Sequence, residues 1–147
     1  MPTFEESVQI NAAAAEVFAY ATDLSKMGEW NPDILRVQKL DAGPIKAGSI
    51  FRETRRVGKR EATAAIRVTA HDPPTTHAAE SKALWVTLTY TYHFAALDDG
   101  MTRVDLHARA KGWGPGLLFA GWMLRMARKV DGEQLSRLKA AIEHDKA

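Results

Sequence analysis

Residues 117–124 are Leu117-Leu118-Phe119-Ala120-Gly121-Trp122-Met123-Leu124, a run without a polar side chain. The run opens a helix predicted from residue 115 to about residue 145, whose second half carries one apolar stripe, formed by Leu135, Leu138 and Ile142. A stripe suits a helix that packs on a sheet, but a segment that is apolar all round needs partners on more than one side. We therefore predict a curved sheet that wraps this helix and leaves a cavity between the two, suited to a small apolar ligand.

The composition is that of one globular domain covering residues 1–147. Apolar residues make up 46% of the chain and charged residues 26%, which is ordinary for a soluble protein. The absence of cysteine excludes disulfides, thiolate metal sites and a cysteine nucleophile, and it favours a cytoplasmic location. The N-terminal residues lack the basic and apolar regions of a signal peptide, and residues 117–124 are fewer than the roughly 20 needed to span a bilayer. We therefore expect no integral membrane association. A net charge of +2 is too small to indicate nucleic-acid binding, so we expect no nucleic-acid partner either.

Most of the chain before the C-terminal helix is predicted to form strands. After a first strand over residues 3–10, Asn11 is expected to cap a helix from Ala12 to about Thr22. A short second helix is expected to begin at Asp23 and to end near Trp30, because the following Asn31-Pro32 pair disfavours helical geometry. Further strands are then predicted over residues 34–40, 49–57, 60–70, 76–81, 84–97 and 102–111.

The alternation of side chains in the last two strands selects the turn between them. A two-residue Asp99-Gly100 loop would set apolar positions against charged ones. A three-residue loop over 98–100 keeps apolar side chains on one face and places glycine at the left-handed position of the turn. We therefore predict the longer loop, with Phe94 opposite Val104, Tyr92 opposite Leu106 and Tyr90 opposite Ala108.

Several short pieces follow one another in a characteristic order and spacing: Val17-Phe18-Ala19-Tyr20, Trp30-Asn31-Pro32, Gly43-Pro44, Ala47-Gly48-Ser49-Ile50-Phe51-Arg52-Glu53, Asp72-Pro73-Pro74, Thr89-Tyr90-Thr91-Tyr92-His93-Phe94, Gly100-Met101-Thr102-Arg103-Val104 and Leu135-Ser136-Arg137-Leu138-Lys139. On these pieces the chain resembles the polyketide cyclase/dehydrase-like branch of the START/Bet v 1 (SRPBCC) superfamily over nearly its whole length. The resemblance implies an α+β helix-grip fold. In that fold an antiparallel seven-stranded curved sheet surrounds a long C-terminal helix, two short helices follow the first strand, and a deep pocket lies between sheet and helix. Members include lipid carriers, cyclases and dehydratases, so the resemblance leaves the chemistry open.

Two tyrosines and one charged strand supply the candidate polar groups of such a pocket. Tyr90 and Tyr92 share the inner face, where a phenol can donate a hydrogen bond to a ligand carbonyl or, in an enzyme, polarise it. Simple packing of both rings is the alternative interpretation. Neighbouring residues of a strand point to opposite faces, so either Arg52 or Glu53 faces the cavity, and the sequence leaves this choice open. Residues 55–60, at the tip of that hairpin, are expected to project into water.

The remaining candidate ligand-binding residues are large apolar side chains expected at the walls and ends of the cavity: Trp30, Leu88, Leu106, Trp113, Phe119, Trp122 and Met123. The histidines predict no site. His93 falls opposite Asp105, but on the outer face, and His71 and His77 can approach one another without a third ligand in view. We expect no metal and no cofactor.

Three functions follow from these residues. The first is binding of a small apolar or amphipathic ligand, lipid-like or polyketide-like, in the internal cavity. The second is a cyclase or dehydratase acting on a polycarbonyl substrate, with Glu53 and Tyr90 as the candidate catalytic residues. The third is a protein-interaction module that uses the basic hairpin or an open pocket mouth, in a chain that is a monomer or a homodimer.

Overall fold

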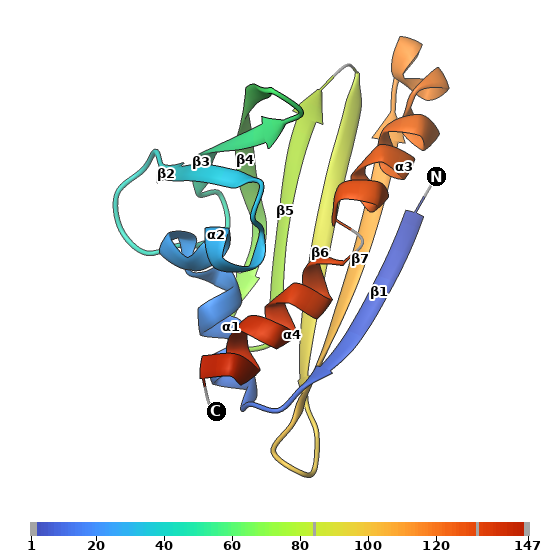
Figure 1. Cartoon of the computed structure of the whole chain (residues 1–147). Helices are drawn as coiled ribbons and strands as arrows, with labels where there is room; N and C mark the ends of the chain where they lie inside the picture. The colour runs from blue at the N-terminus through green and yellow to red at the C-terminus, as the bar shows by residue number, and fades with distance from the viewer. Residues whose placement is uncertain (1–2, 84, 132, 146–147) are drawn as a thin grey trace.

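The fold is a seven-stranded antiparallel sheet with its helices on one side (Figure 1). The computed structural model describes residues 3–83, 85–131 and 133–145. The strands lie in the order β1-β7-β6-β5-β4-β3-β2. Their bounds are β1 Thr3–Ile10, β2 Ile34–Lys39, β3 Ile50–Val57, β4 Arg60–Asp72, β5 Thr76–Ala83, β6 Val86–Ala96 and β7 Thr102–Gly112. The helices are α1 Ala14–Thr22, α2 Met27–Trp30, α3 Ala120–Asp131 and α4 Gln134–Asp145, with 3-10 turns η1 Leu24–Lys26 and η2 Gly114–Leu118.

The predicted register of the last hairpin is confirmed. Phe94 lies opposite Val104, Tyr92 opposite Leu106 and Tyr90 opposite Ala108. The turn is closed by the N–H of Leu97, which donates to the carbonyl oxygen of Met101 at 2.8 Å, and Gly100 has the left-handed φ of 79° that the three-residue loop needs. The strand begins at Val86 rather than at residue 84, and Leu84 lies outside the described residues.

The C-terminal helical segment is long, as predicted, but it is divided. A 3-10 turn comes first, α3 follows and ends at Asp131, and α4 begins at Gln134. Glycine has a low helix propensity, which agrees with a division at this point of the sequence, although Gly132 itself lies outside the described residues. In Figure 1, α4 crosses one end of the sheet while α3 runs along the other end, beside β7 and β1. No helix within the described residues is both long enough and apolar enough to cross a bilayer.

The expected cap of the first helix is wrong. Helix α1 begins at Ala14, two residues later than predicted, and the cap position is held by Ala13, which forms no side-chain capping bond. The backbone N–H of Asn11 donates instead to a carboxylate oxygen of Glu143 in α4, at 2.9 Å. The backbone becomes helical only at Ala14, and Ala13 is still extended, so Asn11 lies too early in the chain to hold the cap position. The second helical segment is confirmed: Asp23 precedes η1, its side chain accepts a hydrogen bond from the N–H of Ser25 at 3.0 Å, and α2 ends at Trp30.

The hydrophobic core occupies the α1 and α4 end of the molecule. It joins side chains from the centre of β7 and the apolar faces of α1 and α4, including Val17, Val104, Leu106, Leu135, Leu138 and Ile142, each at most 3% exposed. The stripe predicted for the second half of the C-terminal helix is therefore buried. The pocket lies beside this core, over strands β3 to β6, and shares Ala21 and Phe94 with it.

Candidate functional site

A cavity of about 310 Å³ lies between the inner face of strands β3 to β6 and the helices. Its walls are mostly apolar, with Phe51 contributed by β3, Ile66 by β4, and Leu88 and Phe94 by β6. Side chains of a strand alternate between its two faces, so every second residue of β6 from Leu88 to Phe94 lines this cavity. The cavity is open to solvent beside the small side chains of Ala62 and Ala64, which are exposed although they face inward.

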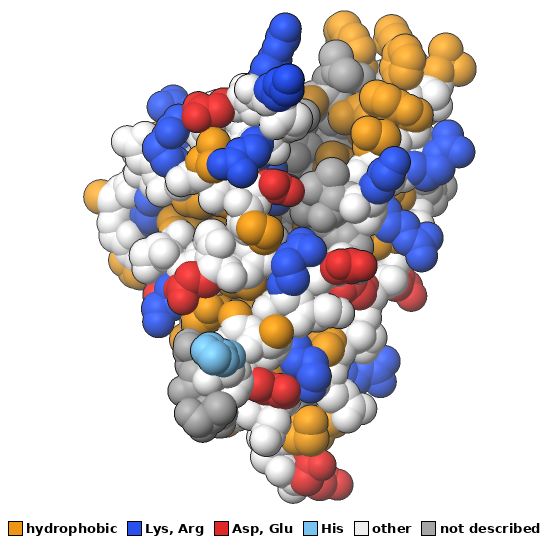
Figure 2. Space-filling view, in the orientation of Figure 1, with side chains coloured by type: hydrophobic (Ala, Val, Ile, Leu, Met, Phe, Trp, Pro, Cys, Tyr) orange, Lys and Arg blue, Asp and Glu red, His pale blue; other side chains and the backbone are white. Residues whose placement is uncertain are grey.

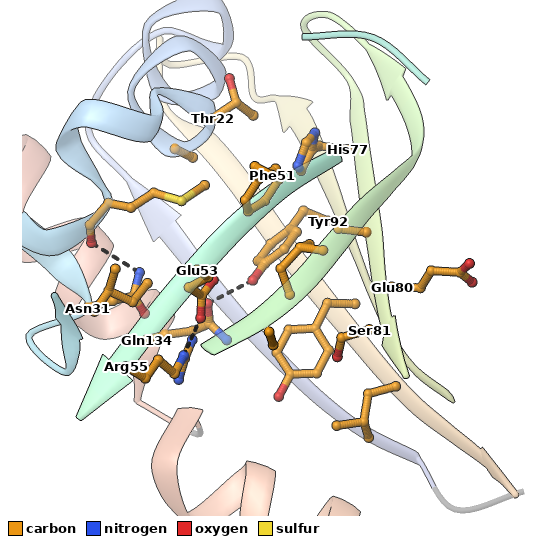
Figure 3. A pocket seen from close by; sticks show the side chains of 18 of the residues that line it. Thr22, Asn31, Phe51, Glu53, Arg55, His77, Glu80, Ser81, Tyr92 and Gln134 are labelled. Carbon is orange, nitrogen blue, oxygen red and sulfur yellow. Dashed lines mark hydrogen bonds and ion pairs between the residues drawn. The ribbon is translucent and has the colours of Figure 1, made fainter. Parts of the chain in front are cut away.

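An ion pair between Glu53 and Arg55 forms the first polar group on the wall (Figure 3). The Nε of Arg55 donates to Oε1 of Glu53, and their side chains are 28% and 13% exposed. Both face inward because Phe51, two residues before Glu53, fills the cavity wall. The choice left open by the sequence is thereby decided in the structure: Glu53 lines the pocket, whereas Arg52 lies on the outer face and is exposed. The expectation that Arg55 projects into water is wrong, because its own strand turns it onto the carboxylate.

A second polar group joins the sheet to the start of α4. The hydroxyl of Tyr92 donates to Oε1 of Gln134 at 2.7 Å, and Gln134 is 3% exposed. Within the described part of the chain, no acceptor lies within hydrogen-bond distance of the amide Nε2 of Gln134. A buried donor without a partner is unfavourable, so this amide is suited to an oxygen acceptor supplied by a ligand. Tyr90 also lines the pocket, with its ring edge-to-face against Phe4 at a centroid distance of 6.1 Å.

A histidine pair stands at the far wall of the pocket. The Nδ1 atoms of His71 and His77 lie 3.0 Å apart, and both rings pack against Phe18 of α1. Burial, and then the charge of His71, lower the pKa of His77 to about 4, and burial alone lowers the pKa of His71. Near neutral pH both rings are therefore uncharged, with one Nδ1 donating and the other accepting. His77 itself lines the pocket, and His71 does not.

The outer-face pair predicted from the hairpin register forms no site. His93 lies opposite Asp105 as expected, but the carboxylate of Asp105 accepts from the Ser7 hydroxyl at 2.7 Å and from Arg103 Nε at 3.0 Å. Within the described residues, no group of three or more His, Asp and Glu side chains could hold a metal ion.

Of the predicted site residues, Glu53, Leu88, Tyr90 and Tyr92 line the pocket. Trp30 and Leu106 are buried in the core and do not reach it. Met123 packs partly buried against the same core. Trp113, Phe119 and Trp122 lie on the surface, 41%, 45% and 52% exposed.

The placement of these last three residues overturns the prediction that the run 117–124 is buried on every side. Leu124 is buried, with 4% of its surface exposed, but Leu117 and Leu118 are 72% and 84% exposed. The reason is local: the 3-10 turn η2 packs on the neighbouring loop through its backbone. A Cβ atom at Gly116 would overlap the carbonyl oxygen of Trp85. The backbone fills the space that the apolar side chains were expected to occupy, and those side chains face outward.

Arg55, His77 and Gln134 are among the pocket residues that were not predicted. His77 lies on β5, where small residues such as Ala78 and Ala79 give no clear alternation, so its face could not be derived from the pattern. Gln134 begins α4 directly after the division of the helix, and its direction depends on where that division falls. The spacing of two between Glu53 and Arg55 puts both on one face, but the expectation that the hairpin tip lies in water outweighed this signal.

Comparisons with known proteins agree with this architecture. A family model described as polyketide cyclase / dehydrase and lipid transport matches residues 1–143. The solved structure of the di-domain ARO/CYC BexL from the BE-7585A biosynthetic pathway has a TM-score of 0.81 at 16% identity, over 97% of this chain and 47% of that chain. This chain thus spans about half the length of BexL. No functionally curated protein matches the sequence.

Two further solved structures match along nearly their whole length. Ara h 8.0201 has a TM-score of 0.75 at 15% identity, over 97% of this chain and 98% of that chain. The Zhui aromatase/cyclase from Streptomyces sp. R1128 has a TM-score of 0.74 at 17% identity, over 98% and 92%. At such low identities these likenesses show a common helix-grip fold.

Proposed function

The chain belongs to the polyketide cyclase/dehydrase and lipid transport family, and from this premise we propose that it binds a small apolar or amphipathic molecule in the pocket. The observation that carries the proposal is a mainly apolar cavity of about 310 Å³, with Glu53, Arg55, Tyr92 and Gln134 among its polar lining residues. Pockets that bind small molecules have this composition and volumes of about 300–1,000 Å³. Lipid-like and polyketide-like molecules both fit the description.

The polar wall supports a ligand with an uncharged oxygen acceptor at one end. The Gln134 amide offers a buried donor without a described acceptor. The charge of Arg55 is balanced by Glu53, so the wall has little net charge with which to attract an ionised ligand. Burial of the apolar body would drive affinity, at about 25 cal/mol per Å² removed from water before the cost of association. The carbonyl or hydroxyl oxygen would then fix the orientation.

The test is a substitution that fills the pocket, compared with the same substitution at the neighbouring residue. Ala64 lines the cavity, whereas Ala65, next to it on β4, pairs with outward-facing Arg52. We expect Ala64→Trp to weaken binding of the fluorescent probe 1-anilinonaphthalene-8-sulfonate by about tenfold or more, and Ala65→Trp to leave it within about twofold. Native mass spectrometry of the purified protein would identify a co-purified ligand. Equal probe binding by both variants would contradict the proposal.

One observation favours a second function, an enzyme of the cyclase or dehydratase type. Glu53 places a carboxylate inside the pocket, on the same wall as Tyr92 and Gln134 (Figure 3). A carboxylate there can remove a proton next to a carbonyl that a tyrosine hydroxyl polarises. Arg55 occupies Oε1 of Glu53, so the other oxygen would have to act as the base.

Glu53→Gln separates the two functions. An enzyme would lose conversion of a polycarbonyl thioester, followed by mass spectrometry, and would still bind the probe. The control is Glu61→Gln, at an exposed position that does not line the pocket. Absence of conversion by the wild-type protein would leave binding as the function of the pocket.

A further inference from the structure

A cluster of exposed apolar side chains covers one end of the molecule, at the upper right of Figure 2. It comes from the turn between β5 and β6, from η2 with the residue on either side of it, and from the first turn of α3. We call these six residues the apolar tip: Trp85, Trp113, Leu117, Leu118, Phe119 and Trp122. They are six of the nine large apolar side chains that are exposed within the described residues, so the exposure is concentrated and not scattered. Patches of this kind mark an interaction surface.

The backbone holds the apolar tip in place. The N–H of Trp113 donates to the carbonyl oxygen of Trp85 at 3.0 Å. Cβ atoms at Gly112 and Gly116 would overlap the backbone of Gly116 and of Trp85, so the two loops approach as closely as glycine allows. Trp85 has a φ of 65°, in the left-handed region that a bulky residue rarely adopts, and its side chain is 56% exposed. A strained backbone position whose large apolar side chain is more than half exposed indicates a role beyond folding.

The surroundings of the apolar tip are basic. Between Asp105 and Asp131 the chain contains five of its twenty Lys and Arg residues and none of its eighteen Asp and Glu residues, so the rest of the chain is net negative. Lys111, Arg125 and Lys129 are exposed, and none has a carboxylate partner among the side chains that the structure describes. In Figure 2, blue side chains lie directly below the orange cluster.

We propose that the apolar tip docks on the surface of an anionic lipid bilayer. Tryptophan and leucine side chains enter the boundary between headgroups and acyl chains, and flanking lysines and arginines bind anionic headgroups. The cluster protrudes: its two most exposed members, Leu117 and Leu118, stand on a single 3-10 turn. A second copy of this chain is the wrong partner, because a symmetric contact through the apolar tip would bring the unpaired cations of both copies together.

Docking would bring the lipid surface close to the pocket. Helix α3 carries Trp122 in the apolar tip and Ala127 on the pocket wall, and Ser81 and Leu88 line the pocket on the two strands that the Trp85 turn connects. The proposal does not rest on the ligand-binding function, since bilayer binding is measured without any ligand.

The test is sedimentation of the purified full chain with vesicles at low salt. One set of vesicles is phosphatidylcholine mixed with phosphatidylglycerol, and the other is phosphatidylcholine alone. We expect binding to the anionic vesicles with a blue shift of tryptophan emission, and at least about tenfold weaker binding to the neutral ones. Leu117→Ser combined with Leu118→Ser should weaken anionic binding by about tenfold, and Leu40→Ser, at a 46% exposed leucine on another surface, should not.

Charge reversal tests the contribution of the basic side chains to bilayer binding. Lys111→Glu combined with Lys129→Glu should abolish the preference for anionic vesicles, while Arg67→Glu, at an exposed position on β4, should leave it unchanged. The proposal is overturned if the wild-type protein stays in the supernatant with anionic vesicles. It is equally overturned if the double serine variant binds them as well as the wild type does. A dimer that the serine substitutions dissociate, without vesicle binding, would assign the apolar tip to self-association instead.

Discussion

Helix α4 buries Leu135, Leu138 and Ile142 against one half of the sheet, whereas α3, over the other half, buries Ala120 and Leu124. Helix α4 is also held by hydrogen bonds to distant backbone groups. The Nε of Arg137 donates to the carbonyl oxygen of Trp30 at 3.0 Å, and the Nζ of Lys139 to that of Gln9 at 2.7 Å. Among the described side chains of α3 no such bond is present.

The same sheet therefore supports a folding core along β1 and β7 and the pocket along β3 to β6. Where a helix supplies large inward side chains, the space fills; where it supplies Ala127, a cavity remains and the larger side chains turn outward. Most side chains of the folding core are thus separate from those that line the candidate pocket. The variants below test how complete that separation is.

The largest difference in stability is expected between substitutions at two leucines of the C-terminal segment. Leu138→Ala removes a side chain that is 0% exposed and should lower the free energy of unfolding by about 2–5 kcal/mol. Leu118→Ala, at a side chain that is 84% exposed, should change it by less than about 0.5 kcal/mol. Urea denaturation of both variants measures the difference. Similar losses in the two would mean that the apolar tip belongs to the folding core.

The pocket wall should contribute a dependence of stability on pH through His77. Its pKa is about 4 in the folded protein and about 6.5 in the unfolded chain, so between these values the unfolded chain binds the extra proton. Stability is then complete above pH 6.5 and falls as the pH is lowered to 4, by about 3 kcal/mol at most. His77→Gln should flatten the profile in urea denaturation at a series of pH values. Exposed His93 provides the control, since His93→Gln should retain the wild-type slope.

The sequence predicted those parts of the fold and pocket in which long strands alternate. The β6 and β7 pattern was long enough to specify a register, and that register placed Leu88, Tyr90 and Tyr92 inward. In β3 the pattern fitted both faces, because charged residues stand at consecutive positions, so the choice between Arg52 and Glu53 required the structure.

The surface position of Trp113, Phe119 and Trp122 could not be predicted from hydrophobicity. An apolar side chain is expected inside, but the space beside β5 and β6 is closed by backbone, with Gly116 against Trp85. Close backbone contact of this kind depends on a pairing of two loops that are distant in sequence. His77 and Gln134 were missed because each acquires its direction from tertiary contacts and not from a periodic pattern.

A smaller effect is expected from the ion pair inside the pocket. Arg55→Met leaves the Glu53 carboxylate, 13% exposed, without this partner and should lower stability by about 1–2 kcal/mol. The matched pair on the outer surface is Arg36 with Glu61, whose side chains are 65% and 56% exposed, and Arg36→Met should change stability by less than about 0.5 kcal/mol. Adding Glu53→Gln to Arg55→Met should recover most of the loss. Thermal unfolding that fails to distinguish the inner pair from the outer one would show that the pocket wall is as well solvated as the surface.

The smallest effect is expected from one hydroxyl that links the two halves. Tyr92→Phe removes the bond to Gln134 Oε1 at 2.7 Å and leaves a buried acceptor unpaired, which should lower stability by about 1 kcal/mol. Replacing both partners, Tyr92→Phe with Gln134→Leu, should restore stability, because no buried polar atom of the pair then remains. If Gln134 orients the ligand, the double variant should nevertheless bind the fluorescent probe more weakly than the single variant. If stability is recovered and probe affinity is unchanged, the role of Gln134 is only to join α4 to the sheet. Arg55 would then be the residue that binds the polar end of the ligand.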